Sequence, residues 1–575
     1  MEIKKTIETD VLVIGGGGAG ERAAYEAFKQ GVKVSVVVKG ELGNSGCTTR
    51  SFSELSAYSA AFAHSDPRDN SYLHYSDTVY QGNGLCNEKL VRILTQNAPK
   101  RMLELDRAGC KFVKNGNKYE QLLADASTVP RACHYGADTG RQIAGTLANL
   151  IRKTNINIYE NIVITKLLTF NGTVTGALGI DIKKESIILF KAKSVVLATG
   201  GGGQIYSLSG QPEDITGDGF SLAVRAGAEL VNMEFIQFGP ALVYPITGYL
   251  LVTNFWRLNP KLYNKDKIEF LDKYIPDDLT KEDVIRAKQF AFPFIINYPA
   301  MYLDIAMHSE ITNGNGTEHG GIFLDISHNA PEVIENKVPV TFKWLLDRGV
   351  DIRKQPIEIA PVAQCFIGGV KFNEFAETNV PGLYVCGEVG GGLHGAARPG
   401  GNLLAISQVF GHIAGISAAK RALPISSIKI DQEQVDNEIK RLNSLIKNKA
   451  VNPQKIIDRL RKAMWNNVSI VKNKDGLEKT LNIVNELRRV DWLKVGTNSP
   501  KNILKIIELD FMLDVSSYVI RASLERKESR GTFYRDDYPK INNCDFSRIF
   551  CLTQECGETK LRKETSNKLD NFYIC

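Results

Sequence analysis

The chain opens with an apolar strand that runs directly into a glycine-rich turn. Residues Val11–Ile14 are followed by the sequence GGGGAG at 15–20 and by a helical stretch over 21–29. A second run rich in β-branched residues covers 32–38. This order of strand, glycine turn, helix and strand is typical of the first unit of a buried parallel sheet. It predicts a nucleotide-binding α/β fold.

The spacing Gly15-x-Gly17-x-x-Gly20 has a physical meaning. Glycine permits a tight turn and a close approach to a pyrophosphate, and the following helix offers free N–H groups at its N-terminus. The second strand ends in Val38-Lys39, where many dinucleotide folds place an acidic residue for the ribose. Glu41 is either a substitute for that residue or a charge in the loop.

Two later segments repeat the strand-to-glycine pattern. The apolar run 195–198 leads into Thr199 and four glycines, and residues 382–388 read GLYVCGE. Strands that end in glycine turns so far apart predict one discontinuous domain with a second domain inserted into it. From about Asp431 the sequence becomes charged with helical periodicity, which predicts a helical domain. After Pro539 we expect a polar, irregular tail.

Composition and charge argue against several classes of protein. The 71 basic and 64 acidic residues give a formal net charge of +7, without the concentrated basic stripe of a nucleic-acid binder. The first ten residues have no apolar signal segment, and the apolar stretch 290–307 is interrupted by two prolines and an aspartate. We expect a cytoplasmic protein with no membrane span, and leave open an association with a membrane through a partner.

The ten cysteines include no CxxC pair, and the spacing of the last four fits neither a zinc site nor a ferredoxin-type cluster. We therefore expect reduced thiols and no metal site.

Seven further motifs, together with the opening turn, follow a recognisable order: ATGG at 198–201, TGDG at 216–219, MEFIQF at 233–238, LDIS at 324–327, VPGLY at 380–384, HGAARPGGN at 394–402 and ESRG at 528–531. In this order they resemble the flavoprotein subunits of succinate dehydrogenase and fumarate reductase, and L-aspartate oxidase, from end to end. The resemblance implies FAD as the cofactor and, as the electron-transfer partner, an iron–sulfur subunit.

The fold class that follows is α/β, with a discontinuous Rossmann-like FAD-binding domain, an inserted capping domain and a C-terminal helical domain. The expected ranges are 1–232 and 351–425 for the FAD-binding domain, 233–350 for the capping domain, 426–540 for the helical domain and 541–575 for the tail.

By position in the family motifs, a set of residues is implied to hold FAD. Asp218 and Glu388 would hydrogen-bond the cofactor, although Asp218 is alternatively a turn residue in its Thr-Gly-Asp-Gly loop. The full implied set is Gly15, Gly16, Gly17, Gly18, Ala19, Gly20, Val38, Lys39, Ser45, Gly46, Cys47, Thr199, Gly200, Asp218, Glu388, Asn402, Leu403 and Leu404.

One departure concerns the attachment of the flavin. In succinate dehydrogenases a histidine after the second strand bonds covalently to the flavin. With Lys39 aligned on the family lysine, that position is Gly46, between Ser45 and Cys47. No imidazole is available there, so we expect noncovalent FAD.

The substrate pocket departs further from the family. Gly239 and Gln364 stand where the family has its two substrate histidines, and Asn254 stands at the family glutamate. Thr253 and Arg398 are retained. Carboxylates are held by cations and neutral donors, so these losses leave Arg398 as the clear anion anchor. We expect neither succinate nor fumarate to be turned over at a useful rate.

Two further candidates for catalysis have alternative interpretations. Lys281 aligns with the family arginine that delivers a proton to fumarate, but it is also a plausible solvated charge at a helix start. His134 is expected near the flavin, either in catalysis or in packing. The catalytic candidates are thus Arg398, Thr253, Lys281 and His134.

Three functions remain open at this point. The first is a dehydrogenase or reductase that moves a hydride between flavin and a small anionic substrate and exchanges electrons with an iron–sulfur partner. The second is an oxygen-using oxidase similar to L-aspartate oxidase. The third is an electron-transfer flavoprotein subunit with no substrate of its own.

Overall fold

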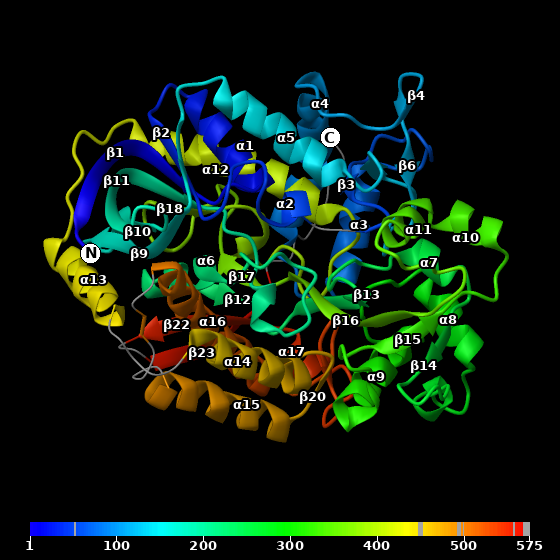
Figure 1. Ribbon diagram of the computed structural model, residues 1–575. Helices are drawn as coiled ribbons and strands as arrows, with labels where there is room; N and C mark the ends of the chain where they lie inside the picture. Colours follow the sequence, from blue (N-terminus) through cyan, green and yellow to red (C-terminus); the bar gives the residue numbers. More distant parts are fainter. Residues whose placement is uncertain (51–52, 447–451, 492–495, 498–499, 556–557, 567–575) are drawn as a thin grey trace.

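The opening glycine turn lies at the end of a strand in the middle of a seven-stranded sheet (Figure 1). The computed structural model describes all residues except 51–52, 447–451, 492–495, 498–499, 556–557 and 567–575. The strand order is β8-β2-β1-β11-β10-β9, and β18 pairs with the end of β11. The strands are β1 (Ile3–Ile14), β2 (Val34–Val38), β8 (Asn157–Glu160), β9 (Ile162–Phe170), β10 (Thr173–Asp181), β11 (Ser186–Leu197) and β18 (Leu383–Val385).

Strands β1, β2, β8, β11 and β18 run parallel, so their carboxyl ends meet at one edge of the sheet. All five residues of β2 are buried, as a parallel strand covered on both faces requires. Helices α1 (Gly18–Phe28), α5 (Thr139–Arg152) and α12 (Asn402–Ala422) pack together over this part of the sheet.

Helix α12 approaches α1 very closely. A Cβ on its Gly415 would lie 2.2 Å from the carbonyl oxygen of Ala23, so only glycine allows this distance. Among the described residues, α12 is the one helix long and apolar enough to cross a membrane. However, 67% of its apolar window is buried inside the protein, as is common for a core helix.

A second sheet lies beside the first, in the green part of Figure 1. Its order is β13-β16-β15-β14, formed by β13 (Ile236–Tyr244), β14 (Lys261–Tyr263), β15 (Ile322–Asp325) and β16 (Ile357–Phe366). The helices around it are α7 (Thr253–Trp256), α8 (Lys281–Lys288), α9 (Met301–Glu310), α10 (Pro331–Lys337) and α11 (Pro339–Leu346). It has its own apolar core, which includes the fully buried Trp256 and Phe270.

Strand β16 lies beyond residue 350, where we expected the capping domain to end. It pairs with both β13 and β15, so it belongs to the capping sheet. The exact domain boundaries stay a prediction.

The C-terminal helical domain packs below the large sheet in Figure 1. Its helices α14, α15 and α16 contact one another, and α16 also contacts α6, whose first residue is Asp218. The helices are α13 (Gln432–Leu445), α14 (Pro453–Val468), α15 (Lys474–Glu486) and α16 (Pro500–Glu525).

The expectation of an irregular tail was wrong for the described residues. Strands β22 (Ile549–Glu555) and β23 (Glu558–Glu564) form a hairpin that pairs with β12 (Leu230–Val231). Phe550, Cys551 and Leu552 are buried there. Lysine, arginine and glutamate residues surround this short apolar run, so the segment is polar on average and the strands were not predicted.

The other helices and strands are α2 (Cys47–Arg50), β3 (Ala57–Ser59), α3 (Ser71–Gln81), α4 (Glu88–Arg107), β4 (Lys114–Asn115), β5 (Lys118–Tyr119), β6 (Gln121–Leu122), β7 (Ala132–His134), α6 (Asp218–Arg225), β17 (Gly369–Lys371), β19 (Gly390–Gly391), β20 (Val471–Lys472), β21 (Tyr534–Arg535) and α17 (Asn543–Phe546).

The hairpin gives a test of the C-terminal fold. Leu552 is 1% exposed, so Leu552→Ala should cost about 2–5 kcal/mol through lost burial and a cavity. The midpoint of thermal unfolding should fall measurably. Lys560→Ala, at an exposed position of the paired strand, is the matched control and should have little effect. Equal midpoints for the two variants would contradict a packed hairpin.

Candidate active site

A cavity of about 600 Å³ opens at the carboxyl ends of the parallel strands. Its walls include the turn after β1, the end of β2, the turn after β11 and the turn after β18. Ligands in open α/β sheets bind at this edge, and the volume is within the usual range for ligand sites. Residues of the capping segment, including Asn254 and Phe292, close one end of the cavity.

The glycine turn is shaped by two close approaches. Gly15 has φ +115°, and a Cβ there would lie 2.2 Å from the carbonyl oxygen of Ala198. A Cβ on Gly20 would lie 2.0 Å from the carbonyl oxygen of Gly15. Of the implied turn residues, 15–19 line the cavity, whereas Gly20 packs the helix against the strand.

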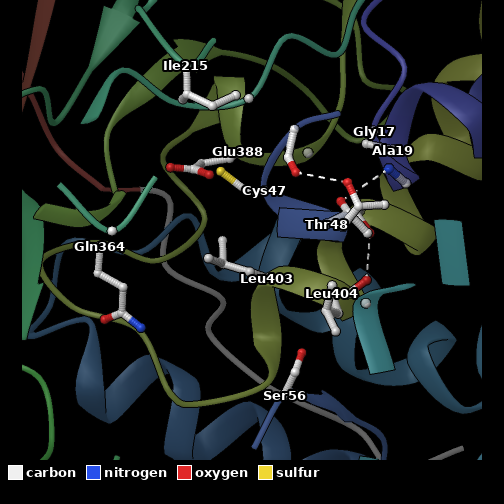
Figure 2. A pocket seen from close by; sticks show the side chains of 18 of the residues that line it. Gly17, Ala19, Cys47, Thr48, Ser56, Ile215, Gln364, Glu388, Leu403 and Leu404 are labelled. Carbon is white, nitrogen blue, oxygen red and sulfur yellow. Dashed lines mark hydrogen bonds between the residues drawn. The ribbon is translucent and has the colours of Figure 1, made fainter. Parts of the chain in front are cut away.

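The N-terminus of α1 faces the cavity. Its N-cap is Gly17, which has no side chain to satisfy the first N–H groups. The Gly18 N–H donates to the Thr48 hydroxyl at 3.2 Å, a contact in the right half of Figure 2. An oxyanion such as a phosphate suits this helix terminus electrostatically.

Lys39, at the end of β2, is half-buried in an ionic cluster. Its Nζ donates to Thr216 Oγ1, Asp218 Oδ2 and Glu508 Oε1, each at 2.9 Å. Burial alone would lower the pKa of Lys39, but the two carboxylates raise it above its ordinary value. Val38, Lys39 and Asp218 all line the cavity.

Glu388 lies in the middle of the cavity wall. Its Oε1 accepts from the Phe366 N–H at 2.9 Å and from Gln211 Nε2 at 2.6 Å. Burial nevertheless raises the pKa of Glu388 to about 7. Figure 2 shows the Cys47 sulfur beside this carboxylate, and burial followed by the charge of Glu388 raises the pKa of the Cys47 thiol.

Other implied cofactor residues also lie on the wall. Thr199 Oγ1 is buried and has no hydrogen-bond partner among the described residues. Leu403 and Leu404, in the first turn of α12, are directed toward the cavity in Figure 2. Gly46 has φ +81°, and a Cβ there would have no atom within 4 Å. The remaining members that line the cavity are Ser45 and Gly200.

Arg398 lies at the capped end of the cavity and is buried. Its Nε donates to Gln237 Oε1 at 3.0 Å, and its Nη1 donates to the Pro399 carbonyl oxygen at 2.9 Å. These bonds fix the plane of the guanidinium and leave further N–H groups for a ligand. Gln364 and Asn254 line the same cavity.

The position of the missing histidine at Gly239 is occupied by another side chain. A Cβ on Gly239 would lie 2.8 Å from the ring of Phe292. An apolar ring therefore takes space where the family has an imidazole.

Three predicted site residues lie elsewhere. Lys281 pairs with Glu269 at 2.9 Å on the surface and does not line the cavity, which fits its alternative interpretation as a solvated charge at a helix start. His134 is also absent from the cavity wall; its Nε2 lies 3.4 Å from Glu120. Asn402 binds His74 and Thr78 of α3 with its side chain instead of facing the cavity. The side chain of Thr253 lies outside the described part of the structure.

Four charged residues on the wall were not found from the sequence, namely Asp125, Arg141, Asp214 and Arg257. Arg257 is exposed and lines the cavity, and Asp125 lines it from the loop before β7. Arg257 lies four residues after the retained Thr253, which was the one available signal. Asp125 lies in an irregular loop without any motif.

Comparison with known proteins decides the family. Residues 10–404 match the model of the FAD binding domain, and residues 457–569 match that of the fumarate reductase flavoprotein C-term. The chain belongs to the succinate dehydrogenase and fumarate reductase flavoprotein family. Like other members of this flavoprotein family, it is an FAD-dependent oxidoreductase.

Relatives of this flavoprotein family cover nearly the whole chain. The chain is 38% identical over 543 residues to a subunit of the fumarate reductase (CoM/CoB) of Methanothermobacter marburgensis, covering 93% of this chain and 95% of that protein. It is 31% identical to an L-aspartate oxidase of Yersinia pestis, covering 92% and 96%. Among solved structures, Mycobacterium smegmatis Sdh1 in complex with UQ1 is similar with a TM-score of 0.86 and 30% identity, covering 98% of this chain and 95% of that one.

The residues of this flavoprotein fit FAD. The glycine turn leaves room for a pyrophosphate at the N-terminus of α1, where Gly17 supplies no cap of its own. The hydroxyl of Thr199 and the carboxyl of Glu388 add polar groups on the wall. The cavity continues from this end to Arg398, so cofactor and substrate would share it.

The close approach at Gly20 gives a test of the cofactor site. Gly20→Ala would place a Cβ 2.0 Å from the Gly15 carbonyl oxygen, so the turn must shift and the flavin content of the purified protein should fall strongly. Gly145→Ala in α5 is the control, because no atom lies within 4 Å of its Cβ. That change should stabilise the helix by about 0.5–1 kcal/mol. Full flavin content in Gly20→Ala, read from absorbance, would contradict the role of the turn.

Proposed function

We propose that this chain is the catalytic flavoprotein subunit of a dehydrogenase or reductase that acts on a small substrate bearing a carboxylate. When bound, FAD would supply the hydride chemistry. The chain's own residues would bind the cofactor, bind the carboxylate of the substrate and exclude water from the capped end of the cavity.

The observation that carries this proposal is Arg398. It is a buried guanidinium on the cavity wall, and Gln237 and the Pro399 carbonyl orient it. A planar fork of donors matches a carboxylate, which it can bind bidentately. Arg257 adds a further positive charge on the wall and would attract an anion toward the cavity.

Other wall residues argue against the usual dicarboxylate site of the family. Phe292 fills the space beside Gly239, while Gln364 and Asn254 are neutral. Gln364 Oε1 is buried without a partner among the described residues, so it is free to accept a hydrogen bond from a ligand. These groups favour a substrate with one carboxylate, a neutral polar group and an apolar part.

The flavin is proposed to be noncovalent. Gly46 offers no side chain, and the neighbouring wall residues Ser45 and Cys47 are not imidazoles. Electrons would be exchanged with an iron–sulfur subunit. Support comes from relatives that are named as subunits of larger enzymes, such as the one from fumarate reductase (CoM/CoB). We propose a cytoplasmic location, with any membrane contact made through that partner.

A second candidate function is an oxidase that uses oxygen. Its support is the 31% identity to an L-aspartate oxidase over nearly the full chain. The neutral Gln364 and the apolar Phe292 at the capped end count against an aspartate-like dicarboxylate. Rapid reoxidation of the reduced flavin by air would favour this candidate.

The proposed function is tested by screening carboxylates against the purified holoprotein. Saturated acids are scored by anaerobic bleaching of the oxidised flavin, and enoates by reoxidation of the reduced flavin. At least one compound with a single carboxylate should react, and faster than succinate or fumarate. The proposal fails if only uncharged compounds react, or none.

Attachment of the flavin gives a simple prediction. Because no imidazole stands at position 46, SDS or acid should release all of the flavin from the protein. The measurement is flavin fluorescence of the protein band on a denaturing gel. A fluorescent band that survives would show a covalent bond.

The role of Arg398 gives another prediction. Arg398→Lys keeps the charge but loses the planar fork, so substrate binding should weaken by roughly 10-fold or more while FAD stays bound. Binding is measured from the change that the reactive carboxylate causes in the flavin spectrum. Arg441→Lys, at an ion pair on α13, is the matched control and should bind as the parent does. Parent-like affinity in Arg398→Lys would make this arginine structural.

A further inference from the structure

An unassigned carboxyl group lies at the capped end of the cavity. Asp125 belongs to the loop between β6 and β7 and lines the same cavity as Arg398. The Gly400 N–H donates to the Asp125 carbonyl oxygen at 2.9 Å, so this loop is fixed beside the segment that carries Arg398. A Cβ on Gly400 would lie only 3.2 Å from the Asp125 backbone nitrogen.

The Asp125 carboxyl lies near two cationic side chains, Arg398 and Lys288. Its Oδ1 is shielded from solvent and has no hydrogen-bond partner among the described residues. Burial raises the pKa of Asp125 to about 6, while the Phe292 N–H, Arg398 and Lys288 act in the opposite direction. Phe292 lies in the loop after α8, Arg398 lies in the segment before α12, and Lys288 lies on α8.

The backbone at this loop is strained. Ala126, directly after Asp125, has φ +59°, a conformation that residues with a Cβ adopt at a cost. Such outliers persist where the surrounding structure enforces them, and they cluster at functional sites. Here the strained residue directly follows the one acidic residue of the loop.

Behind Asp125 lies a buried ion pair of the capping segment. Lys288 Nζ donates to Asp304 Oδ2, and both side chains are fully buried. Lys288 is thus paired with Asp304 and acts on Asp125 only through its charge. No ion pair of Asp125 occurs among the described residues.

We propose that Asp125 is the residue that gives a proton to the substrate, or takes one from it, beside Arg398. The inference rests on the proposed function, because it assigns the proton-transfer role within the same cavity. Lys281, the sequence-based candidate for this role, lies at the surface in a pair with Glu269. Asp125 is a titratable group on the wall whose Oδ1 has no hydrogen-bond partner in the described part of the chain.

The reaction balances with one proton. In the reducing direction, bound reduced FAD would supply a hydride for a C–H bond at one carbon of an enoate, while the π bond of the enoate breaks and the flavin is oxidised. The O–H bond of protonated Asp125 breaks, and its proton forms the C–H bond at the neighbouring carbon. The ionised Asp125 then takes a proton from water. In the oxidising direction each bond change is reversed, and Asp125 accepts the proton. A carboxyl group with a pKa near the working pH suits both directions.

The first test needs no turnover. Infrared difference spectra of the holoprotein are recorded between about pH 5 and about pH 8, a range that spans the titration of a carboxyl with a raised pKa. The parent should show the carbonyl band of a buried protonated carboxyl that Asp125→Asn lacks. Asp347→Asn, which removes an exposed carboxylate at the end of α11, should keep the band. If the parent and Asp125→Asn give the same spectra, the proposal is overturned.

The second test uses the reactive carboxylate from the screen in single turnovers. Asp125→Asn should lower the rate by roughly 100-fold or more, with binding within a few-fold of the parent. Asp125→Glu should restore part of the rate, and Asp347→Asn should match the parent. A parent-like rate and pH profile in Asp125→Asn overturns the proposal. So does a loss of binding with an unchanged rate, which would make Asp125 an anchor for a cationic group. If no carboxylate reacts with the parent, it is the proposed function that has failed.

Discussion

A half-buried ammonium ion, paired with two carboxylates, links three parts of the chain at the cofactor end of the cavity. Lys39 Nζ bonds to Asp218 at the start of α6 and to Glu508 on α16. Burial of a charge is costly unless it is paired, so the end of β2 keeps its place only when both carboxylates are present. Glu508 comes from the helical domain, hundreds of residues away in sequence. The Rossmann-like unit at the N-terminus therefore depends on the last third of the chain for its own cavity wall.

At the capped end, the capping segment is held by hydrogen bonds between a helix N-terminus and a carboxylate. Glu54 accepts from the Thr341 N–H at 2.7 Å, from the Thr341 hydroxyl at 2.6 Å and from the Val340 N–H at 3.1 Å. These groups form the N-terminus of α11, where a carboxylate is favoured by the helix dipole. Ser53 and Leu55, the neighbours of Glu54, line the cavity. The hydrogen bonds of Glu54 thus join the capping segment to the cavity wall that it covers.

The sequence was informative where chemistry is encoded in local order. The glycine turn, Glu388 and Arg398 lie in motifs whose spacing reflects backbone geometry, and all of them line the cavity. Single charges in loops carry no such pattern, which explains why Asp125 and Arg257 were overlooked. The hairpin over 549–564 was missed because its short apolar run lies among charged residues that form exposed partners. Asn402 was part of a motif, but its role is to bind α3.

The charges on the cavity wall link the binding of an anion to the binding of protons. Asp125 and Glu388 have raised pKa values because they are buried, and Arg398 lowers the pKa of both. An anion bound at Arg398 would offset that positive charge, and a nearby negative charge favours the neutral form of a carboxyl group. Binding of a carboxylate should therefore raise both pKa values and draw protons into the cavity.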